Sequence, residues 1–221
     1  MTMPAVRQRS IGRPRQAAGV DARELLLEAA VALFAEHGVA GTTIAQIAAK
    51  AGVTPAMVHY YFTNREQLLD AVAAELLLPT ITGVWSPVVE TDEVVSMLRG
   101  VVQRIFKAVE VRPWLPSLWL HEIVSEGGQL RGRVLKGLRF EYVQHLIKAV
   151  AGGQRRGEID PQLEPRLVFI SVLGTTLLPL AAGRLWQQVP LLHSLSRADV
   201  ARHAEALLVS AFSKRRRRRA A

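Results

Sequence analysis

The sequence predicts an all-α protein, and three observations support this fold class. A polar residue is followed three positions later by Glu or Gln at three places, a spacing in which both side chains satisfy free backbone N–H groups at a helix N-terminus. No stretch alternates apolar and polar residues over the length of a strand, and no Asn-Gly or Asp-Gly hairpin signal occurs. Glycine and proline separate the remaining apolar stretches at helical lengths. The three capping pairs are Asp21 with Glu24, Thr43 with Gln46, and Asn64 with Gln67.

These pairs place the first helices of the chain. One helix begins at Asp21 and ends near Gly38, which suits the left-handed backbone of a helix stop. The helix opened by Asn64 is expected to run to about Leu78. Pro79 is expected to stop it, because proline lacks a backbone N–H and clashes with the preceding helical turn.

Residues 79 to 91 are expected to form a less regular connection, followed by helices as far as the C-terminus. Gly127–Gly128, Gly152–Gly153 and Asp160–Pro161 separate these helices. The expected ranges are about 92–111, 113–126, 130–151, 164–188 and 197–214. The chain is therefore long enough for a small N-terminal unit and a larger helical one.

The net charge of +9 is concentrated at the two ends of the chain. Residues 1–20 contain four arginines and no acid, and residues 214–221 contain Lys214 and five arginines. Of the 28 basic residues, ten lie in these tails, which leaves 18 against 19 acidic residues. Such tails favour a polyanionic partner, because each phosphate contact releases condensed counterions. A solvated tail without a specific partner is the alternative.

The chain contains no cysteine, which excludes disulfides, thiolate metal sites and cysteine nucleophiles. This fits a reducing cytosol, and no apolar segment of a signal peptide follows the basic N-terminus, so we expect a cytoplasmic protein. The uncharged stretch 167–183 is shorter than the ~20 residues of a membrane span. It also contains Pro179, and we expect it to be a buried helix with no membrane partner.

Residues 43–62 have the organisation of a helix-turn-helix. The first short helix ends at Gly52, whose missing Cβ permits a tight turn. The second helix begins with Thr54 as N-cap and Pro55 at the first helical position. The turn between them is about three residues long, as this motif requires, and Phe62 is expected to pack on the first helix of the chain. The apolar residues that hold the two helices together are Ile44, Ile47, Val53 and Val58.

The second helix of the motif carries residue types suited to DNA. Pro55 and Ala56 are small enough to let its N-terminal end approach the major groove. Behind them, His59, Tyr60 and Tyr61 can reach bases or phosphates. Core packing is the alternative for the tyrosines, and a simple surface position is the alternative for the histidine.

Several short segments follow one another in a fixed order between residues 21 and 68. They are Leu33-Phe34-Ala35-Glu36-His37-Gly38, Thr42-Thr43-Ile44, Ile47-Ala48, Ala51-Gly52-Val53, His59-Tyr60-Tyr61-Phe62, Arg65-Glu66 and Leu68. In this order they resemble the DNA-binding domain of the tetracycline-repressor (TetR) family. The resemblance implies that the second motif helix enters the major groove and that the start of the next helix contacts phosphate. The DNA-contacting residues it implies are Thr43, Thr54, Pro55, Ala56, His59, Tyr60, Tyr61 and Arg65. Ala56 often is Gly in the family and His59 often is Tyr, so base-level specificity stays open.

The resemblance also predicts the domain organisation. We expect a flexible basic arm at 1–20, a DNA-binding domain at 21–80, a helical regulatory and dimerisation domain at 81–213, and a basic tail at 214–221. In the family the last two helices pair across a two-fold axis, which implies a homodimer on a palindromic double-stranded operator. The helix expected at 164–188 is apolar nearly all round, as needed if one face meets its own core and another a partner subunit.

The two tails suggest further contacts. Gly12-Arg13-Pro14-Arg15 resembles an AT-hook core, in which Arg13 and Arg15 would follow a narrow A·T-rich minor groove. A solvated arm is the alternative. For the run Lys214 to Arg219 the sequence does not decide between non-specific DNA binding, nucleoid or RNA association, and no function.

By position, the larger helical unit is expected to bind a small hydrophobic or amphipathic effector of unknown identity. The candidate pocket residues are Phe106, Trp114, Trp119, His121, Phe140 and His145, drawn from a wider set that also includes Met97, Leu118, Glu122 and Tyr142. For each of them, ordinary core or surface packing is the alternative.

The sequence predicts neither an enzyme nor a metal or cofactor site. His121-Glu122 begins like the zinc motif H-E-x-x-H, but Ser125 stands where the second histidine is needed. No phosphate-binding loop or nucleophile elbow is present. The predicted function is therefore sequence-specific transcriptional regulation, with repression relieved by the effector. The alternatives are an activator without a small ligand and a nucleoid-associated protein that coats nucleic acid through its basic tails.

Overall fold

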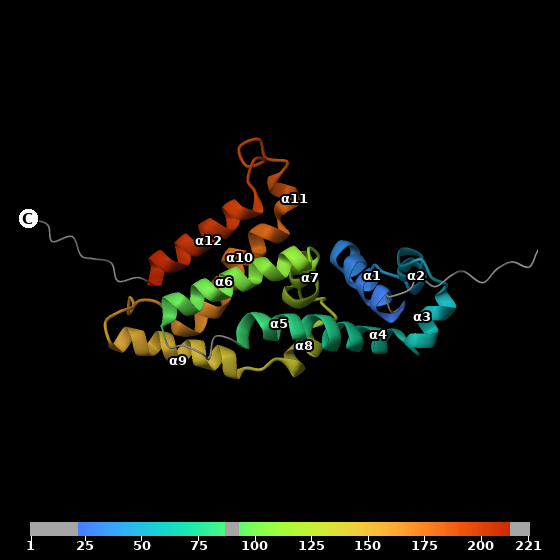
Figure 1. The fold of residues 1–221 in the computed structure, drawn as a ribbon, viewed down its shortest axis with the longest axis horizontal. Coiled ribbons are helices and arrows are strands. Elements are labelled where there is room, and N and C mark those ends of the chain that lie inside the picture. The colour runs from blue at the N-terminus through green and yellow to red at the C-terminus, as the bar shows by residue number, and fades with distance from the viewer. Residues whose placement is uncertain (1–21, 87–92, 213–221) are drawn as a thin grey trace, which may run out of the picture.

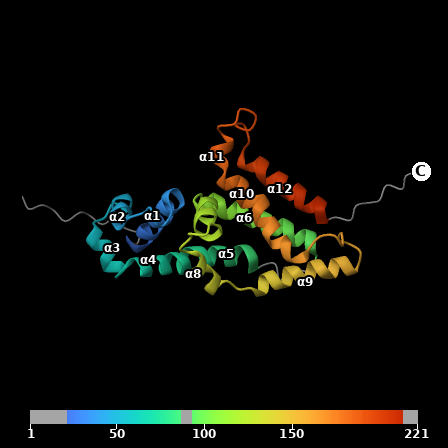
Figure 2. The ribbon, with the colours of Figure 1, turned by 180° about the vertical axis from the view of Figure 1, so that it is seen from behind.

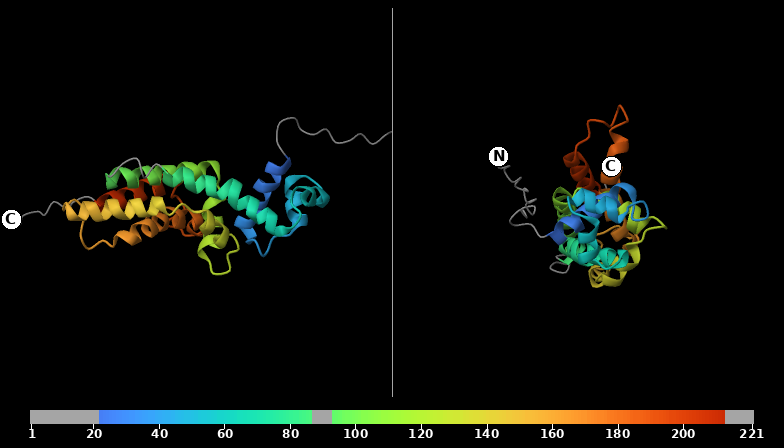
Figure 3. Two further views of the ribbon diagram at one scale, coloured as in Figure 1. Left: turned by 90° about the horizontal axis from the view of Figure 1, so that it is seen from below. Right: turned by 90° about the vertical axis from the view of Figure 1, so that its right-hand side faces the viewer.

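The computed structural model describes residues 22–86 and 93–212 of the 221-residue chain. Within these ranges every regular element is a helix, so the all-α prediction is confirmed. The helices form an elongated molecule with α1, α2 and α3 gathered at one end (Figures 1 and 3). The arm 1–20, the cap at Asp21 and the tail 214–221 lie outside the described residues.

The N-terminal helices pack around a small apolar core. They are α1 (Ala22–His37), α2 (Ile44–Ala51) and α3 (Pro55–Tyr61). Leu26 and Phe34 of α1, Ile47 of α2 and Val58 of α3 are fully buried. Phe62, just after α3, is 3% exposed, and Arg23 of α1 lies over its ring, so the expected packing of Phe62 on the first helix is confirmed.

A single long helical run leads from this unit into the rest of the molecule. It consists of α4 (Arg65–Ala71), the π-helical η1 (Val72–Leu77) and α5 (Leu78–Trp85). The prediction that Pro79 ends this helix was therefore wrong. The π-helical turns, in which the Leu78 N–H still donates to Ala73 O, come directly before the proline, and the helix continues past it. The expected irregular connection is helical up to residue 85, and residues 87–92 are not described.

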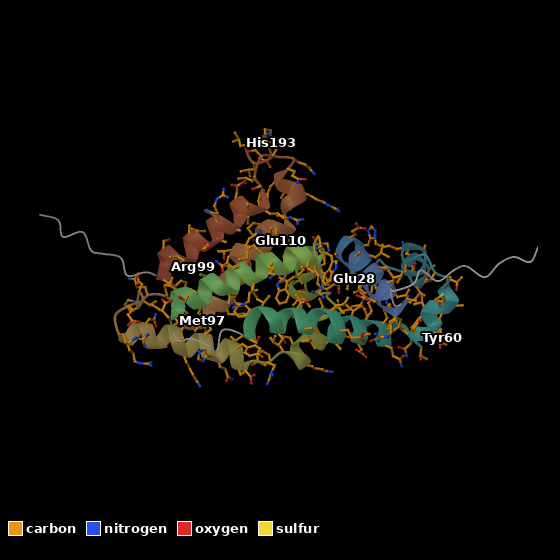
Figure 4. All side chains as sticks on the ribbon, viewed as in Figure 1. Glu28, Tyr60, Met97, Arg99, Glu110 and His193 are labelled. Atoms are coloured by element: carbon orange, nitrogen blue, oxygen red, sulfur yellow. The ribbon has the colours of Figure 1, made fainter. Side chains whose placement is uncertain are left out.

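The remaining helices form the larger unit. They are α6 (Val94–Val111), α7 (Leu115–Leu118), the π-helical η3 (Trp119–Val124), α8 (Arg131–Gly137), α9 (Glu141–Arg155), the 3₁₀ turn η4 (Pro165–Leu167), α10 (Val168–Ala181), α11 (Gly183–Trp186) and α12 (Arg197–Phe212). Around α6, the helices α10 and α12 pack against each other and against α6, as Figure 2 shows from behind. The hairpin between α11 and α12 projects from the body, with His193 near its tip (Figure 4).

Two expected helices are each divided in two. Within the expected range 164–188, a turn at Ala182 separates α10 from α11. The prediction for residues 130–151 was a single helix, whereas the backbone of Leu138 is extended and separates α8 from α9. Gly137, the last residue of α8, lies so close to Leu78 of α5 that a Cβ at this glycine would overlap the Leu78 side chain. The end of α8 therefore packs closely against a segment distant in the sequence.

One described helix has the length and composition of a membrane span, and it is the run Arg65–Trp85 rather than the apolar stretch around α10. Within its most apolar 18-residue window, 56% of the helix is buried inside the protein. A core helix of a folded domain has this property.

Candidate nucleic-acid interface

The helix-turn-helix has the geometry that its residue types predict. Before α2, the Thr43 backbone N–H donates to Gln46 Oε1 at 2.7 Å and the Gln46 N–H donates to Thr43 Oγ1 at 3.2 Å, a complete capping box. After α2, Gly52 has a φ of 69°, and the Val53 N–H donates back to Ala48 O at 3.0 Å. These local bonds fix the direction in which the chain leaves α2.

The start of α3 is capped in the same local way. Thr54 Oγ1 accepts a hydrogen bond from the Met57 N–H at 3.4 Å, and Pro55 occupies the first turn. Val58 is fully buried and anchors α3 against the core, which leaves the opposite side of the helix free. The three-residue turn Gly52 to Thr54 agrees with the predicted motif.

Most of the predicted DNA-contacting residues are exposed. Tyr60 is the clearest case, with 83% of its surface accessible at the end of the molecule farthest from α9 (Figure 4). Tyr61 is half-buried against the core, and its ring meets the Tyr60 ring edge to face at 5.2 Å between centroids. The other exposed members are Thr43, Thr54, Pro55, Ala56 and His59. Arg13 and Arg15 lie outside the described residues.

Arg65 has a structural role that the sequence did not predict. Its Nη1 donates to the carbonyl of Thr42 at 2.7 Å, and its Nη2 donates to the carbonyl of Val39. The guanidinium at the start of α4 therefore holds the turn between α1 and α2. The predicted phosphate contact would have to use its remaining N–H groups.

A buried carboxylate connects the larger unit to the same turn. Glu122 of η3 is 4% exposed, and its Oε1 accepts a hydrogen bond from the Val39 N–H at 2.7 Å. Its Oε2 accepts from the Gln129 N–H at 2.8 Å. From the sequence, Glu122 was a candidate pocket residue and part of an incomplete zinc motif, and nothing in the local sequence points to a partner 83 positions away.

A second connection joins α8 to α4. Arg133 donates from Nε to Asp70 Oδ1 at 2.6 Å and from Nη2 to a Glu66 carboxylate oxygen. Partial burial of Arg133 opposes its charge, but the hydrogen bonds to the two carboxylates outweigh this, and its pKa is raised. A further contact joins α1 to α7, where Trp114 Nε1 donates to Glu28 Oε2 at 3.1 Å. The N-terminal unit is thus fastened to the larger unit by several polar contacts.

An open cleft of about 700 Å³ lies between these two units. One wall comes from α1, with Ala32, Ala35 and Glu36. The other lining residues come from the segment 113–121, which packs directly against α1, and from the α10 to α12 region. Trp186, Leu180 and Leu192 contribute apolar surface, and Arg184 and Arg197 contribute positive charge. Within the described residues, neither of these two arginines forms an ion pair.

The predicted pocket residues do not gather around one cavity. Trp114 and His121 line the cleft, whereas Phe106 and Trp119 pack against the core. Phe140 is 51% exposed just before α9, and His145 is half-buried within α9. From the wider set, Met97, Leu118 and Tyr142 are buried in the core. Within residues 22–86 and 93–212, no three His, Asp or Glu side chains are grouped to hold a metal ion.

One face of the larger unit carries unpaired apolar side chains. On and just before α10, Leu167, Ile170 and Leu178 are each more than half exposed, and their spacing places them along one side of the helix. Leu207 of the neighbouring α12 is 45% exposed. Buried residues such as Val172 and Leu208 occupy the opposite sides of the two helices.

Sequence comparisons point to one class of protein. Residues 26–72 match the family model described as bacterial regulatory proteins, tetR family. The chain is 30% identical over 148 residues to the HTH-type transcriptional repressor SCO4008 of Streptomyces coelicolor, covering 66% of this chain and 72% of that protein. It is 35% identical over 139 residues to the HTH-type nicotine-responsive transcriptional repressor HdnoR of Paenarthrobacter nicotinovorans, covering 62% of this chain and 71% of that protein.

Comparison of structures supports the same fold. The crystal structure of AibR in complex with isovaleryl coenzyme A and operator DNA is similar with a TM-score of 0.67 and 24% sequence identity. The similarity covers 86% of this chain and 98% of that chain. The whole arrangement of an N-terminal helix-turn-helix and a larger helical unit is therefore shared.

Proposed function

Because the chain belongs to the tetR family of bacterial regulatory proteins and is a DNA-binding transcriptional regulator, we propose that it is a homodimeric repressor released from a palindromic operator by a small amphipathic ligand. The observation that carries the DNA-binding side of this proposal is α3. Its inner side is anchored by the buried Val58, while its outer side presents His59 and Tyr60 at the end of the molecule. A helix held and exposed in this way suits insertion into a major groove.

The exposed apolar face of α10 and α12 supports dimerisation. A two-fold axis beside this face would bury Leu167, Ile170 and Leu178 of both copies, so each residue contributes twice. Burying one such side chain stabilises by about 1.5–3 kcal/mol. Ile170→Asp is therefore expected to raise the dimer dissociation constant by about 100-fold or more. Light scattering at micromolar concentration measures this, and a wild-type monomer would contradict the dimer.

The cleft supports a ligand with an apolar body and an anionic group. Trp114, Trp186 and Leu180 offer apolar contacts, and Arg184 and Arg197 lie at the same cleft. Small molecules also appear in the descriptions of similar proteins, since HdnoR is named as a nicotine-responsive repressor and AibR was solved in complex with isovaleryl coenzyme A and operator DNA. A ligand that touches both walls would bind differently when the two units shift relative to each other. Such a difference in affinity is what release from DNA requires.

Selection of bound duplexes from a random DNA pool tests the proposal. It is done at ~0.15 M salt with the full chain and with residues 214–221 removed, because contacts dominated by charge weaken steeply with salt. A palindrome recovered from both samples supports an operator-binding dimer. Enrichment that disappears with the tail favours the coating alternative. Isovaleryl coenzyme A and nicotine, added to the operator complex, then compare an anionic with a cationic ligand, and the anionic one is expected to release more DNA.

A further inference from the structure

Two regions that are distant in the sequence meet at the carboxylate of Glu122. They are the turn after α1, and the π-helical η3 together with the loop that follows it and precedes α8. One oxygen accepts the N–H of Val39 and the other accepts the N–H of Gln129, at 2.7 and 2.8 Å. The side chain is 4% exposed, so water has little access to either bond.

This arrangement depends on both of its hydrogen bonds. A buried carboxylate is costly unless hydrogen bonds replace its hydration, and bonds to a charged acceptor are about twice as strong as neutral ones. Among the described residues, Glu122 forms no ion pair, so the two backbone N–H groups supply this stabilisation. If the α1–α2 turn moved away from η3, one buried oxygen of Glu122 would lose its hydrogen-bond donor, which is costly. The two hydrogen bonds therefore hold the turn at a defined distance from η3.

Two glycines make room for the carboxylate and its helix. Gly38 has a φ of 70°, and a Cβ there would lie 3.4 Å from Glu122 Oε1. A Cβ on Gly128 would overlap the backbone of Glu122 itself. The close approach at Gly128 is therefore open only to glycine, whereas at Gly38 it is the positive φ that favours glycine.

The same helices form the walls of the cleft. Leu120 and His121, which directly precede Glu122, line one wall. Ala35 and Glu36 of α1 also line the cleft, close to the end of α1 that leads into Gly38 and Val39, and α1 packs directly against α7 and η3. A molecule in the cleft that pushes α1 away from η3 would therefore act on both ends of the Glu122 to Val39 hydrogen bond.

We propose that Glu122 is the positioning residue that couples the cleft to DNA binding. With the cleft empty, its carboxylate holds the α1–α2 turn and, through it, the helix-turn-helix in the arrangement that fits the operator. Ligand in the cleft displaces η3 from α1, breaks the bond to Val39, and releases the repressor. This inference rests on the proposed function, since it assigns the residue through which that regulation acts.

Because the effector is unidentified, the test imitates a bound ligand with a substitution that fills part of the cleft. Ser117 lines the cleft on α7, and Ser117→Trp adds a bulky side chain there. The second substitution, Glu122→Gln, turns one acceptor oxygen into a donor that opposes a backbone N–H. Glu126→Gln is the matched control, because Glu126 is an exposed carboxylate four residues further along the chain.

Operator affinity is measured for the wild type, each single variant and the double variant. Ser117→Trp and Glu122→Gln are each expected to weaken operator binding about 10-fold, and the double variant is expected to be no weaker than Glu122→Gln alone. Glu126→Gln is expected to bind as the wild type does. If the two single effects multiply in the double variant, Glu122 does not carry the coupling, and the inference is overturned while the repressor function stands. A wild type that selects no operator overturns both.

Amide hydrogen exchange gives a second test that does not use the Glu122→Gln variant, so it does not depend on whether that variant folds. In the DNA-free protein with Glu122 intact, Ser117→Trp alone is expected to speed exchange of the Val39 N–H about 10-fold. The amides in the middle of α6 are expected to be unchanged, which shows that the fold persists. If Ser117→Trp weakens operator binding but leaves the exchange rate of the Val39 N–H unchanged, the added side chain acts without breaking the Glu122 to Val39 hydrogen bond, and the inference is overturned.

Discussion

The helix starts of the N-terminal unit and of the larger unit are stabilised in different ways. Thr43, Thr54 and Asn64 cap α2, α3 and α4 with their own side chains. In the larger unit, α6 and α12 begin near Glu93 and Ser196, which accept hydrogen bonds from backbone N–H groups. Between α7 and α11, Glu164 caps the 3₁₀ turn η4 that leads into α10, whereas α7, η3, α8, α9 and α11 have no side-chain cap bond at their starts. The ends of these helices are therefore set by packing, whereas those of the DNA-binding unit are set by neighbouring residues in the chain.

The largest effect is expected for the packing of an uncapped helix. Leu146 of α9 is fully buried, so Leu146→Ala should lower the free energy of unfolding by ~2–5 kcal/mol through lost burial and a residual cavity. Denaturant unfolding measures this. Lys148→Ala on the same helix is the control, because Lys148 is exposed and should change stability by less than ~0.5 kcal/mol. Equal effects of the two substitutions would contradict the role of packing.

A smaller effect, on binding rather than folding, is expected at the exposed side of α3. Tyr60→Ala should weaken operator binding by ~1–3 kcal/mol and leave the unfolding transition unchanged, because the side chain is 83% exposed. Titration of labelled operator and circular dichroism give the two readouts. Tyr60→Phe separates the hydroxyl from the ring. Wild-type affinity of Tyr60→Ala with a native spectrum would remove Tyr60 from the interface.

The local capping of the N-terminal unit predicts a change of about 1 kcal/mol. Thr43→Ala removes the acceptor for the Gln46 N–H and should lower stability by ~0.5–2 kcal/mol. Thr63→Ala is matched in chemistry, since Thr63 is exposed and its hydroxyl caps no helix. The measurement is again denaturant unfolding. A control that is as destabilising as Thr43→Ala would show that the capping box contributes little.

The smallest effect concerns the ion pair between α1 and η1. Arg23 donates to Glu75, at 2.6 Å for Nη2 to Oε1, and this hydrogen bond lowers the pKa of Glu75 below its ordinary value of 4.5 despite some burial. A carboxyl with a lowered pKa stabilises the fold above its unfolded pKa and loses that contribution as the pH falls through the folded pKa. Because both side chains are about one-third exposed or more, the contribution is ~0.2–1 kcal/mol.

The measurement compares the wild type with Glu75→Gln between pH 7 and pH 3. The stability difference is expected above pH 4.5 and should shrink below it as the wild-type carboxyl is protonated. A difference that grows toward acidic pH would contradict the ion pair.

Interactions between residues close in the sequence could be predicted, whereas interactions between distant residues could not. Thr43 with Gln46, and Thr54 with Met57, interact three residues apart, so the helix-turn-helix was readable from residue types. The break after Gly137 was not, and there the chain packs against Leu78 of another helix, 59 residues away. Pro79 misled the prediction of α4, because a π-helical segment directly before it allows the helix to continue.

In the candidate sites, too, some residues could be predicted from the sequence and others could not. The exposed residues of α3 follow from helical geometry once Val58 is assigned to the core. Among the predicted pocket residues only Trp114 and His121 line the cleft, because side chains from α1 and from residues 179–200 complete it. Which aromatic side chains face a cavity depends on how distant helices cross, and one sequence does not contain that information.

The sequence by itself determined the all-α class, the helix-turn-helix at residues 43–62, and the family, because short-range capping and turn chemistry are encoded within a few residues. Only the tertiary structure decided that Arg65 holds the α1–α2 turn and that Glu122 meets Val39 across 83 positions. The physical reason is burial. A carboxylate such as Glu122 reads as an ordinary surface residue until packing removes its water, and only then do its two backbone partners make it the link between the cleft and the DNA-binding helices.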